Sequence, residues 1–347
     1  MTMSATLPDW QRAHGGPLRQ ALVRNQPDDF QVTEKLDFEL TGDGEHDYLW
    51  LEKTNANTSW VARGLARKAG VAARDVSFAG MKDRIALTRQ WFSVRRPSAA
   101  GTDWATLDLP GVRVLATARN QRKLRRGAHS GNHFRIALRG VTAIDEKLGE
   151  LLQRIRDSGV PNYFGEQRFG RDAGNIAMAR AFFSGSRLKR EDRSIALSAA
   201  RSLIFNRILE CRVTNGTWNV IQPGELVNLD GSGSVFPVEQ PDEAIRRRCG
   251  ELDIHPGAAL WGQGEPGSRG AIASLEKSVI AEFPDLATGL ERHTKQARRA
   301  TRLAVRDFTW SLQGDVLWLE FFLTRGGFAT AVLREIAEYG KNGVGPT

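Results

Sequence analysis

A lysine and an aspartate, Lys82 and Asp83, stand side by side shortly after a segment that is typical of a short strand. The strand is predicted at residues 76–79, and Gly80 ends it. A carboxylate at the rim of a sheet, with a cation beside it in sequence, lies where functional sites are often built. Because an aspartate is ionised near neutral pH, Asp83 could serve as a nucleophile or as a general base. A Lys-Asp pair in a turn is more often structural, so the pattern alone leaves both interpretations open.

A second group of candidate residues is basic. Residues 119–126 form a dense cluster that contains Arg119, Arg122, Lys123, Arg125 and Arg126. Such charges release counterions when they meet a nucleic-acid backbone, although a solvated loop has the same composition. A further basic run, residues 292–302, has spacings of three and four that predict neighbouring positions on a helix for several of its cations, Lys295, Arg298, Arg299 and Arg302.

The charge balance agrees with a polyanionic partner. The 347 residues include 49 Lys and Arg against 40 Asp and Glu, which gives a formal net charge of +9. At roughly 150 residues per domain, this length predicts about two domains. An apolar content of 41% and a charged content of 26% are typical of a folded globular protein. Two cysteines, Cys211 and Cys249, do not make a disulfide framework, which favours a reducing compartment.

The sequence lacks motifs for nucleotides, metals and membranes. The run from Gly262 to Gly267 fits a GxGxxG pattern, but Pro266 stands where a helix should begin, so we interpret the run as a turn. No GxxxxGK[ST] pattern occurs, and His129 and His133 are not expected to share a helical face. No apolar run approaches the roughly 20 residues of a membrane span. We therefore expect no cofactor, no metal and no membrane partner.

The first 140 residues are predicted to form mainly short strands joined by polar turns. The clearest strand covers residues 133–139, where Phe134 and Ile136 share one face. A helix is predicted from residues 57–59 to Gly70.

Helices dominate the middle of the chain. Thr142 and Asp145 resemble a capping box, and the helix that follows them is expected to end at residues 158–159. Further helices are predicted at 176–183 and 194–213, a strand at 316–323, and a last helix at 331–339. Strands at both ends with helices between them predict an α+β fold in which one domain is inserted into another.

The stretch around Lys82 and Asp83 resembles the signature of the TruD family of tRNA pseudouridine synthases, Gly-x-Lys-Asp-x-x-Ala-x-Thr. Its fixed positions are filled here by Gly80, Lys82, Asp83, Ala86 and Thr88. Six further blocks are similar to family blocks and follow in the same order: residues 29–34, 42–46, 131–134, 160–170, 197–206 and 327–335. One departure lies outside the core motifs, where Glu225 follows Gly224 and the family pattern predicts Asp.

The resemblance implies that the chain isomerises uridine to pseudouridine in tRNA, at position 13 in the D-arm, without a cofactor. It makes Asp83 the catalytic aspartate. In this reaction the C1′–N1 bond breaks, the uracil turns while it stays bound, and C5 joins C1′. The carboxylate would either add to C1′ or remove the C2′ proton to give a glycal, and the sequence leaves both courses open.

The resemblance also implies substrate contacts by Phe30, Asn132 and Phe328, with Phe134 in the same motif as Asn132. The target uridine must leave its stack, so the site needs aromatic rings and amides in place of the lost interactions. At a period of two, Asn132 and Phe134 point to the same side of their strand. Phe134 could stack on the base, or it could pack in the core beside Ile136.

Other positions have looser assignments. Lys82 could orient the Asp83 carboxylate, bind a phosphate, or form a salt bridge in the scaffold. The cations Arg122, Lys123, Arg125 and Arg126 are expected to follow the RNA backbone. Glu45 and His46 fall in a family block and have no chemical role that we can assign.

The architecture implied by the resemblance is a mixed-sheet pseudouridine synthase catalytic domain with an inserted, helix-rich TruD-specific α/β domain. In this sequence, residues 1–157 and 303–347 would form the catalytic domain and residues 158–302 the insert, with RNA in the cleft between them. The expected partner is tRNA, acted on by a cytoplasmic monomer that needs no other protein.

Two other classes of function compete with this interpretation. An RNA-binding protein that keeps the fold but performs no chemistry would function without the Asp83 carboxylate, and the intact Lys-Asp signature argues against it. A metal-dependent nuclease would need clustered carboxylates, and none are evident in the sequence.

Overall fold

The computed structural model describes residues 7–96 and 101–339. The contacts within it define two compact units. We call the first the sheet unit; it contains the described parts of Arg19–Leu148, Arg306–Gly326 and Ala337–Thr347. The second, the helical unit, contains those of Met1–Leu18, Gly149–Val305 and Gly327–Ile336. The division into a catalytic domain of residues 1–157 and 303–347 and an insert of residues 158–302 stays a prediction.

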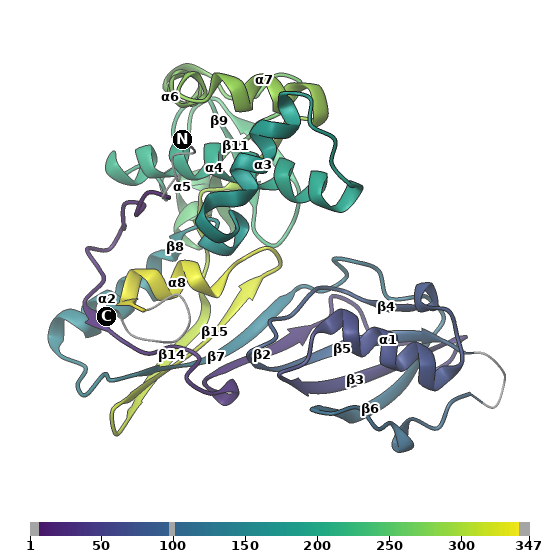
Figure 1. Ribbon diagram of the computed structural model, residues 1–347. Coiled ribbons are helices and arrows are strands. Elements are labelled where there is room, and N and C mark those ends of the chain that lie inside the picture. The colour runs from purple at the N-terminus through teal and green to yellow at the C-terminus, as the bar shows by residue number, and fades with distance from the viewer. Residues whose placement is uncertain (1–6, 97–100, 340–347) are drawn as a thin grey trace. The chain divides into compact units, whose positions relative to one another are not determined.

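The sheet unit is built on an eight-stranded mixed sheet (Figure 1). The strand order is β14-β15-β7-β2-β5-β3-β6, and β4 pairs with β5 beside this path. β2 and β5 are parallel, and the other neighbours are antiparallel. In chain order the strands are β2 (Phe30–Lys35), β3 (His46–Thr54), β4 (Val76–Phe78), β5 (Leu87–Arg95), β6 (Val112–Asn120), β7 (Gly131–Arg139), β14 (Arg306–Gln313) and β15 (Val316–Thr324). The strands predicted at residues 76–79, 133–139 and 316–323 are confirmed.

Helix α1 (Thr58–Ala69) packs its apolar stripe on this sheet. Val61 and Leu65 are fully buried against Leu49, Leu51 and Phe92 of the strands. Gly70 follows the helix in the left-handed conformation, with φ 66°, which a residue without a Cβ adopts at little cost. The predicted start and end of this helix are therefore confirmed.

Helix α2 (Glu146–Ser158) begins later than the sequence pattern predicts. The Asp145 carboxylate accepts the Leu148 N–H at 2.9 Å, which makes Asp145 the N-cap. The capping box assigned to Thr142 is wrong, because an aspartate is as good a cap as a threonine and lies one turn closer to the apolar stripe.

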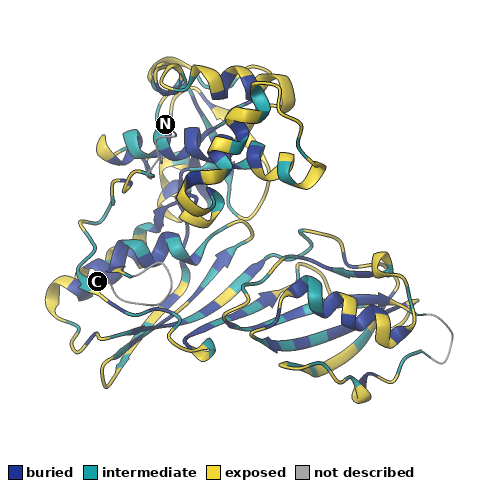
Figure 2. Ribbon diagram, viewed as in Figure 1, coloured by how far each residue is buried: buried dark blue, intermediate teal, exposed yellow. Residues whose placement is uncertain are grey.

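The helical unit surrounds the long helix α4 (Arg190–Thr214), whose buried face Figure 2 shows. α3 (Gly174–Phe183), α6 (Gly270–Ala281) and α7 (Pro284–His293) pack on it with a four-stranded antiparallel sheet of order β10-β9-β11-β12. Those strands are β9 (Glu225–Leu229), β10 (Val235–Val238), β11 (Ile254–Leu260) and β12 (Ala297–Ala300). The smaller elements of the helical unit are β8 (Val160–Pro161), α5 (Glu243–Gly250), β13 (Arg302–Leu303) and α8 (Ala329–Ile336). The short strands β1 (Arg19–Gln20) and β16 (Ala337–Glu338) belong to the sheet unit, where they pair in parallel. No helix in the described ranges is both long and apolar enough to cross a membrane.

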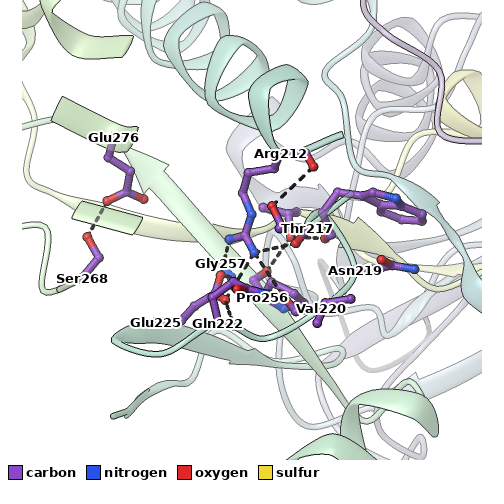
Figure 3. Close-up of polar contacts among 12 residues, drawn as sticks. Arg212, Thr217, Asn219, Val220, Gln222, Glu225, Pro256, Gly257, Ser268 and Glu276 are labelled. Carbon is purple, nitrogen blue, oxygen red and sulfur yellow. Dashed lines mark hydrogen bonds and ion pairs between the residues drawn. The ribbon is translucent and has the colours of Figure 1, made fainter. Parts of the chain in front are cut away.

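A buried ion pair connects α4 to this smaller sheet (Figure 3). The side chains of Arg212 and Glu225 are 1% and 0% exposed and bind each other directly. Arg212 also donates to the carbonyls of Thr217 and Val220, and the Glu225 carboxylate accepts the N–H of Gly257 at 3.1 Å. Glu225 thus has a structural partner at the position where the family pattern predicts Asp.

The second basic run does not form a helix. α7 ends at His293. Lys295 forms an isolated parallel bridge with Gln263, Arg298 and Arg299 lie on β12, and Arg302 lies on β13. Arg298 pairs with the buried Glu276 at 2.8 Å, and Arg302 donates to the carbonyls of Cys249 and Ile254 at 2.6 and 2.9 Å. The helical expectation is wrong because these arginines bind acceptors inside the unit, and their spacing reflects those partners.

The packing of α3 against α7 depends on a glycine. A Cβ added to Gly289 would lie 2.2 Å from Cγ of Phe183, inside the ring's van der Waals surface. Gly174, at the start of α3, has nothing within 4 Å of such a Cβ and has an ordinary helical φ of −55°.

We expect Gly289→Ala to lower the free energy of unfolding by about 1–3 kcal/mol, because the added methyl forces the two helices apart. Gly174→Ala is the matched control, and it should be neutral or stabilise by up to about 1 kcal/mol. Urea unfolding followed by circular dichroism measures both, and equal stability of the two variants would contradict this packing.

Candidate active site

Asp83 lies in the sheet unit, in the loop of residues 79–86 between β4 and β5. Its side chain is 41% exposed, so a solute can reach the carboxylate. The Arg24 guanidinium donates from Nη2 to Oδ2 of Asp83 at 2.7 Å. A charge-assisted bond of this kind fixes the direction of the carboxylate.

Sequence reasoning did not single out Arg24. The residue has a positive φ of 62° and its guanidinium lies over the Phe30 ring, 4.1 Å from the centroid. It therefore contacts a predicted substrate residue and the predicted catalytic residue at once. No local pattern marks it, because Arg24 and Asp83 are 59 positions apart in sequence and only the folded chain brings them together.

Lys82 binds residues of the sheet. Its ammonium lies 2.9 Å from Oε2 of Glu34 on β2 and donates to Oδ1 of Asn132 on β7 at 2.7 Å. The side chains of Lys82 and Glu34 are 5% and 0% exposed. Glu34 and Asn132 stand opposite each other in the β2–β7 ladder, so one ammonium spans the two strands. Of the roles considered for Lys82, these contacts match the salt bridge in the scaffold.

Buried groups bind the loop backbone on its inner side. The Thr58 hydroxyl accepts the Lys82 N–H at 3.1 Å and donates to Oε1 of Gln90 at 3.1 Å. Gln90 in turn donates to the Gly80 carbonyl at 3.2 Å. The Lys53 ammonium donates to the carbonyl of Asp83 itself at 3.1 Å. Thr58, Gln90 and Lys53 are fully buried, so water does not compete for these bonds.

The predicted aromatic residues of the sheet unit lie together on one face. The rings of Phe30 and Phe134 meet edge to face at 6.2 Å, and Phe134 stacks on Phe321 at 5.4 Å. Phe30 is 2% exposed and Phe134 9%. Asn132 lies on the same face, since Glu34 stands opposite Asn132 and Val32 opposite Phe134. Both rings are packed in this state, and the Arg24 guanidinium covers Phe30.

Phe328 belongs to the helical unit. It lies in the loop before α8, half-buried, with its ring 6.0 Å from that of Phe164. The Arg168 guanidinium is 5.8 Å from its centroid. Arg168 also donates to the Ser198 hydroxyl on α4 at 2.8 Å. Phe328, Phe164 and Arg168 thus lie together within the helical unit.

The predicted backbone-binding cations follow β6 in the sheet unit and are all exposed: Arg122, Lys123, Arg125 and Arg126. Leu124 between them is buried, and its N–H binds the Ser93 hydroxyl at 3.0 Å, which fixes the segment to the sheet. The Gly127 N–H donates to the Ala79 carbonyl at 2.8 Å, at the start of the Asp83 loop. The structure thus brings the basic segment and the loop together.

In residues 7–96 and 101–339, His, Cys, Asp and Glu form no group of three that could hold a metal ion. His129 lies beside Gly80, and burial together with the Lys82 ammonium lowers the pKa of its imidazole below the usual value.

Removing one partner of the buried Lys82–Glu34 pair should lower the free energy of unfolding, because the other partner then stays buried without its counter-charge. Lys82→Met leaves the Glu34 carboxylate buried without its cation, so we expect a loss of about 3–5 kcal/mol in the free energy of unfolding. Adding Glu34→Leu removes the charge and should recover most of that loss. Urea unfolding of both variants is the measurement, and a double variant no more stable than the single one would contradict the pairing.

The chain matches known proteins along nearly all of its length. The family model "tRNA pseudouridine synthase D (TruD)" matches residues 15–185 and 177–336. A Methylococcus capsulatus protein named tRNA pseudouridine synthase D is 43% identical over 96% of each chain. A Nitrosococcus oceani protein of the same name is 46% identical over 93% of each. A solved structure from Methanosarcina mazei, described as a candidate TruD protein, has the same fold, with a TM-score of 0.71 at 22% identity and 94% coverage of both chains. Because the family model and these relatives each cover most of the sequence, this chain belongs to the TruD family of tRNA pseudouridine synthases.

Proposed function

We propose that this chain isomerises uridine to pseudouridine in tRNA, at position 13 of the D-arm, with Asp83 as the reacting carboxylate. One observation carries the proposal: the Asp83 carboxylate is 41% exposed on a loop whose backbone is bonded to buried groups. A carboxylate held in this way is already positioned, so it loses little conformational entropy when the substrate binds. Membership of the TruD family supports the tRNA substrate.

The chemistry proceeds by one of two courses. In the first, an Asp83 oxygen adds to C1′ as the C1′–N1 bond breaks, and it leaves when C5 attacks C1′. In the second, the carboxylate removes the C2′ proton to give a glycal, and the proton returns as the C5–C1′ bond forms. Both courses release the C5 proton and place a proton on N1. Arg24 stays beside the carboxylate in both and offsets its changing charge.

The flipped uracil needs a surface to replace its stack. The face formed by Phe30 and Phe134 offers one where the Arg24 guanidinium now lies, 4.1 Å from the Phe30 centroid. A base that takes the place of the guanidinium over the Phe30 ring, while Arg24 keeps its bond to Asp83, would gain about 1–3 kcal/mol of stacking. Phe328, in the Gly-rich loop of the helical unit, is the third ring proposed to contact the substrate.

Asn132 is poised to read the polar edge of the base. An ammonium can only donate, so the bond from Lys82 fixes which end of the amide is oxygen. The amide NH₂ has no protein acceptor in the described parts of the chain and can donate to a uracil carbonyl or to the ribose. We propose that Lys82 acts on the reaction through this orientation of Asn132.

The exposed cations after β6 are proposed to bind phosphates next to the loop. The helical-unit arginines Arg298 and Arg302 bind interior acceptors and are not proposed for this role. We further propose that the chain acts as a monomer in the cytoplasm.

Asp83→Asn should abolish isomerisation, because the amide neither adds to C1′ nor removes a proton, while its volume is nearly unchanged. The measurement is tritium release from tRNA transcripts that carry [5-³H]uridine, in the presence of EDTA, with binding followed by filter retention. We expect a loss of at least about 10³-fold in rate with little change in affinity. Near-normal release by the variant would contradict a chemical role for Asp83, and no release by the wild type with any tRNA would favour a binding protein.

Neutralising Arg122, Lys123 and Arg125 to Gln should weaken tRNA binding and lower the slope of log K against log salt by about 2–3. The control carries Arg63→Gln, Arg67→Gln and Lys68→Gln, which remove the same charge from the exposed side of α1. Titrations between about 50 and 200 mM salt measure both slopes. Equal slopes for the two triple variants would show that the basic segment makes no phosphate contacts.

A further inference from the structure

Lys53 carries a charge in an unusual place. It lies on β3, its side chain is fully buried, and its ammonium donates to two backbone carbonyls, those of Ala56 at 2.8 Å and Asp83 at 3.1 Å. No Asp or Glu of the described ranges forms an ion pair with it. Buried lysines are normally paired with a carboxylate, so a buried ammonium on carbonyls alone points to a specific demand at this position.

Lys53 stays protonated at neutral pH although its burial disfavours the charged form. Burial lowers the pKa of Lys53 to about 8, because removing the ammonium from water disfavours its protonated form. The Asp83 carboxylate opposes this shift and the Lys82 ammonium adds to it. Its cross-strand neighbours, Thr88 on β5 and Val112 on β6, are not ionisable. A methionine would fill the same space without the cost of burying a charge.

The two carbonyls show what the ammonium does. Ala56 lies in the turn that leads into α1, and Thr58 at the start of α1 accepts the Lys82 N–H. Two consecutive residues of the loop are therefore bound. Thr58 accepts the N–H of Lys82, and Lys53 donates to the carbonyl of Asp83. With both polar groups bound on the inner side, the backbone of Asp83 has a fixed position relative to β3 and α1.

We propose that Lys53 is a positioning residue for isomerisation: by binding the Asp83 carbonyl from beneath the loop, its ammonium sets where the reacting carboxylate meets C1′. This role rests on the proposed function of Asp83. It assigns to Lys53 no contact with the substrate, so tRNA affinity should not depend on it.

The position of the ammonium predicts a pH dependence with a definite sign. Below about pH 8 Lys53 is protonated and binds both carbonyls; above it the neutral amine binds them more weakly and no longer attracts Asp83. The rate of the chemical step should therefore fall as the pH rises through about 8. Because the folded-state pKa is below that of an exposed lysine, the protonated form opposes folding, and stability should rise over the same pH range.

The test compares Lys53→Met with Lys68→Met, an exposed lysine of α1 whose ammonium also donates to a carbonyl, that of Thr106. Single-turnover rates are measured from about pH 6.5 to 9.5, together with tRNA affinity, melting temperature and hydrogen exchange of residues 79–86. For Lys53→Met we expect a rate about 10²-fold lower at neutral pH, unchanged affinity, and no decline above pH 8. Exchange should increase in residues 79–86 and not in α1, and the melting temperature should not fall. Lys68→Met should match the wild type throughout.

A wild-type rate for Lys53→Met, or exchange in residues 79–86 that equals the wild type, would overturn the proposal. So would a slower variant whose exchange increases across the whole sheet unit, since that shows a structural role alone. If Lys53→Met does not fold, Lys53→Gln, which keeps an uncharged NH₂ donor, is judged by the same outcomes. Absence of isomerisation by the wild type would contradict the proposed function, and the exchange comparison would then decide only whether Lys53 fixes the loop of residues 79–86.

Discussion

In the sheet unit, buried side chains bind the backbone of two consecutive residues, Lys82 and Asp83, while the Asp83 carboxylate stays accessible. The Lys53 ammonium binds the Asp83 carbonyl and the Thr58 hydroxyl binds the Lys82 N–H. Gln90 supports them by accepting from the Thr58 hydroxyl and donating to the Gly80 carbonyl. These side chains come from β3 and β5, which pair in the sheet, and from α1, which packs on it. The order of these strands and the packing of α1 on them are thus conditions for the geometry at Asp83.

Two charged side chains of the sheet unit, Lys82 and Arg24, also determine the surroundings of Asp83. Lys82 is buried with Glu34 and bonded to Asn132, so its charge lies in the scaffold and its effect reaches the proposed substrate through the amide. Arg24 is more exposed and binds the carboxylate from the solvent side, with the Phe30 ring behind it. The helical unit, in contrast, uses a comparable buried pair, Arg212 with Glu225, to connect α4 with its own sheet. The buried Arg212–Glu225 pair is thus structural, and the buried Lys82–Glu34 pair is related to the proposed chemistry.

The sequence was informative wherever a local pattern determines the structure. The alternation in residues 133–139, the start and end of the helix at 58–69 and the loop that carries Asp83 all follow from neighbouring residues. The partners of that loop do not, because Arg24, Lys53 and Glu34 acquire their roles only through strand pairing. The run at 292–302 misled for a related reason, since spacings of three and four also arise when arginines on a strand bind separate interior acceptors. Thr142 and Asp145 were both able to cap α2, and only the observed bond to the Leu148 N–H decides between them.

The most direct test of the central claim is to map the product on tRNA. A full-length transcript is incubated with the protein, treated with a carbodiimide that marks pseudouridine, and read by reverse transcription. We expect one strong stop, adjacent to uridine 13, that appears with the wild type and is absent with Asp83→Asn under conditions in which both proteins bind the tRNA. A stop that persists with Asp83→Asn, or a wild-type stop at another uridine, would contradict the assignment of the reacting carboxylate or of the target, respectively.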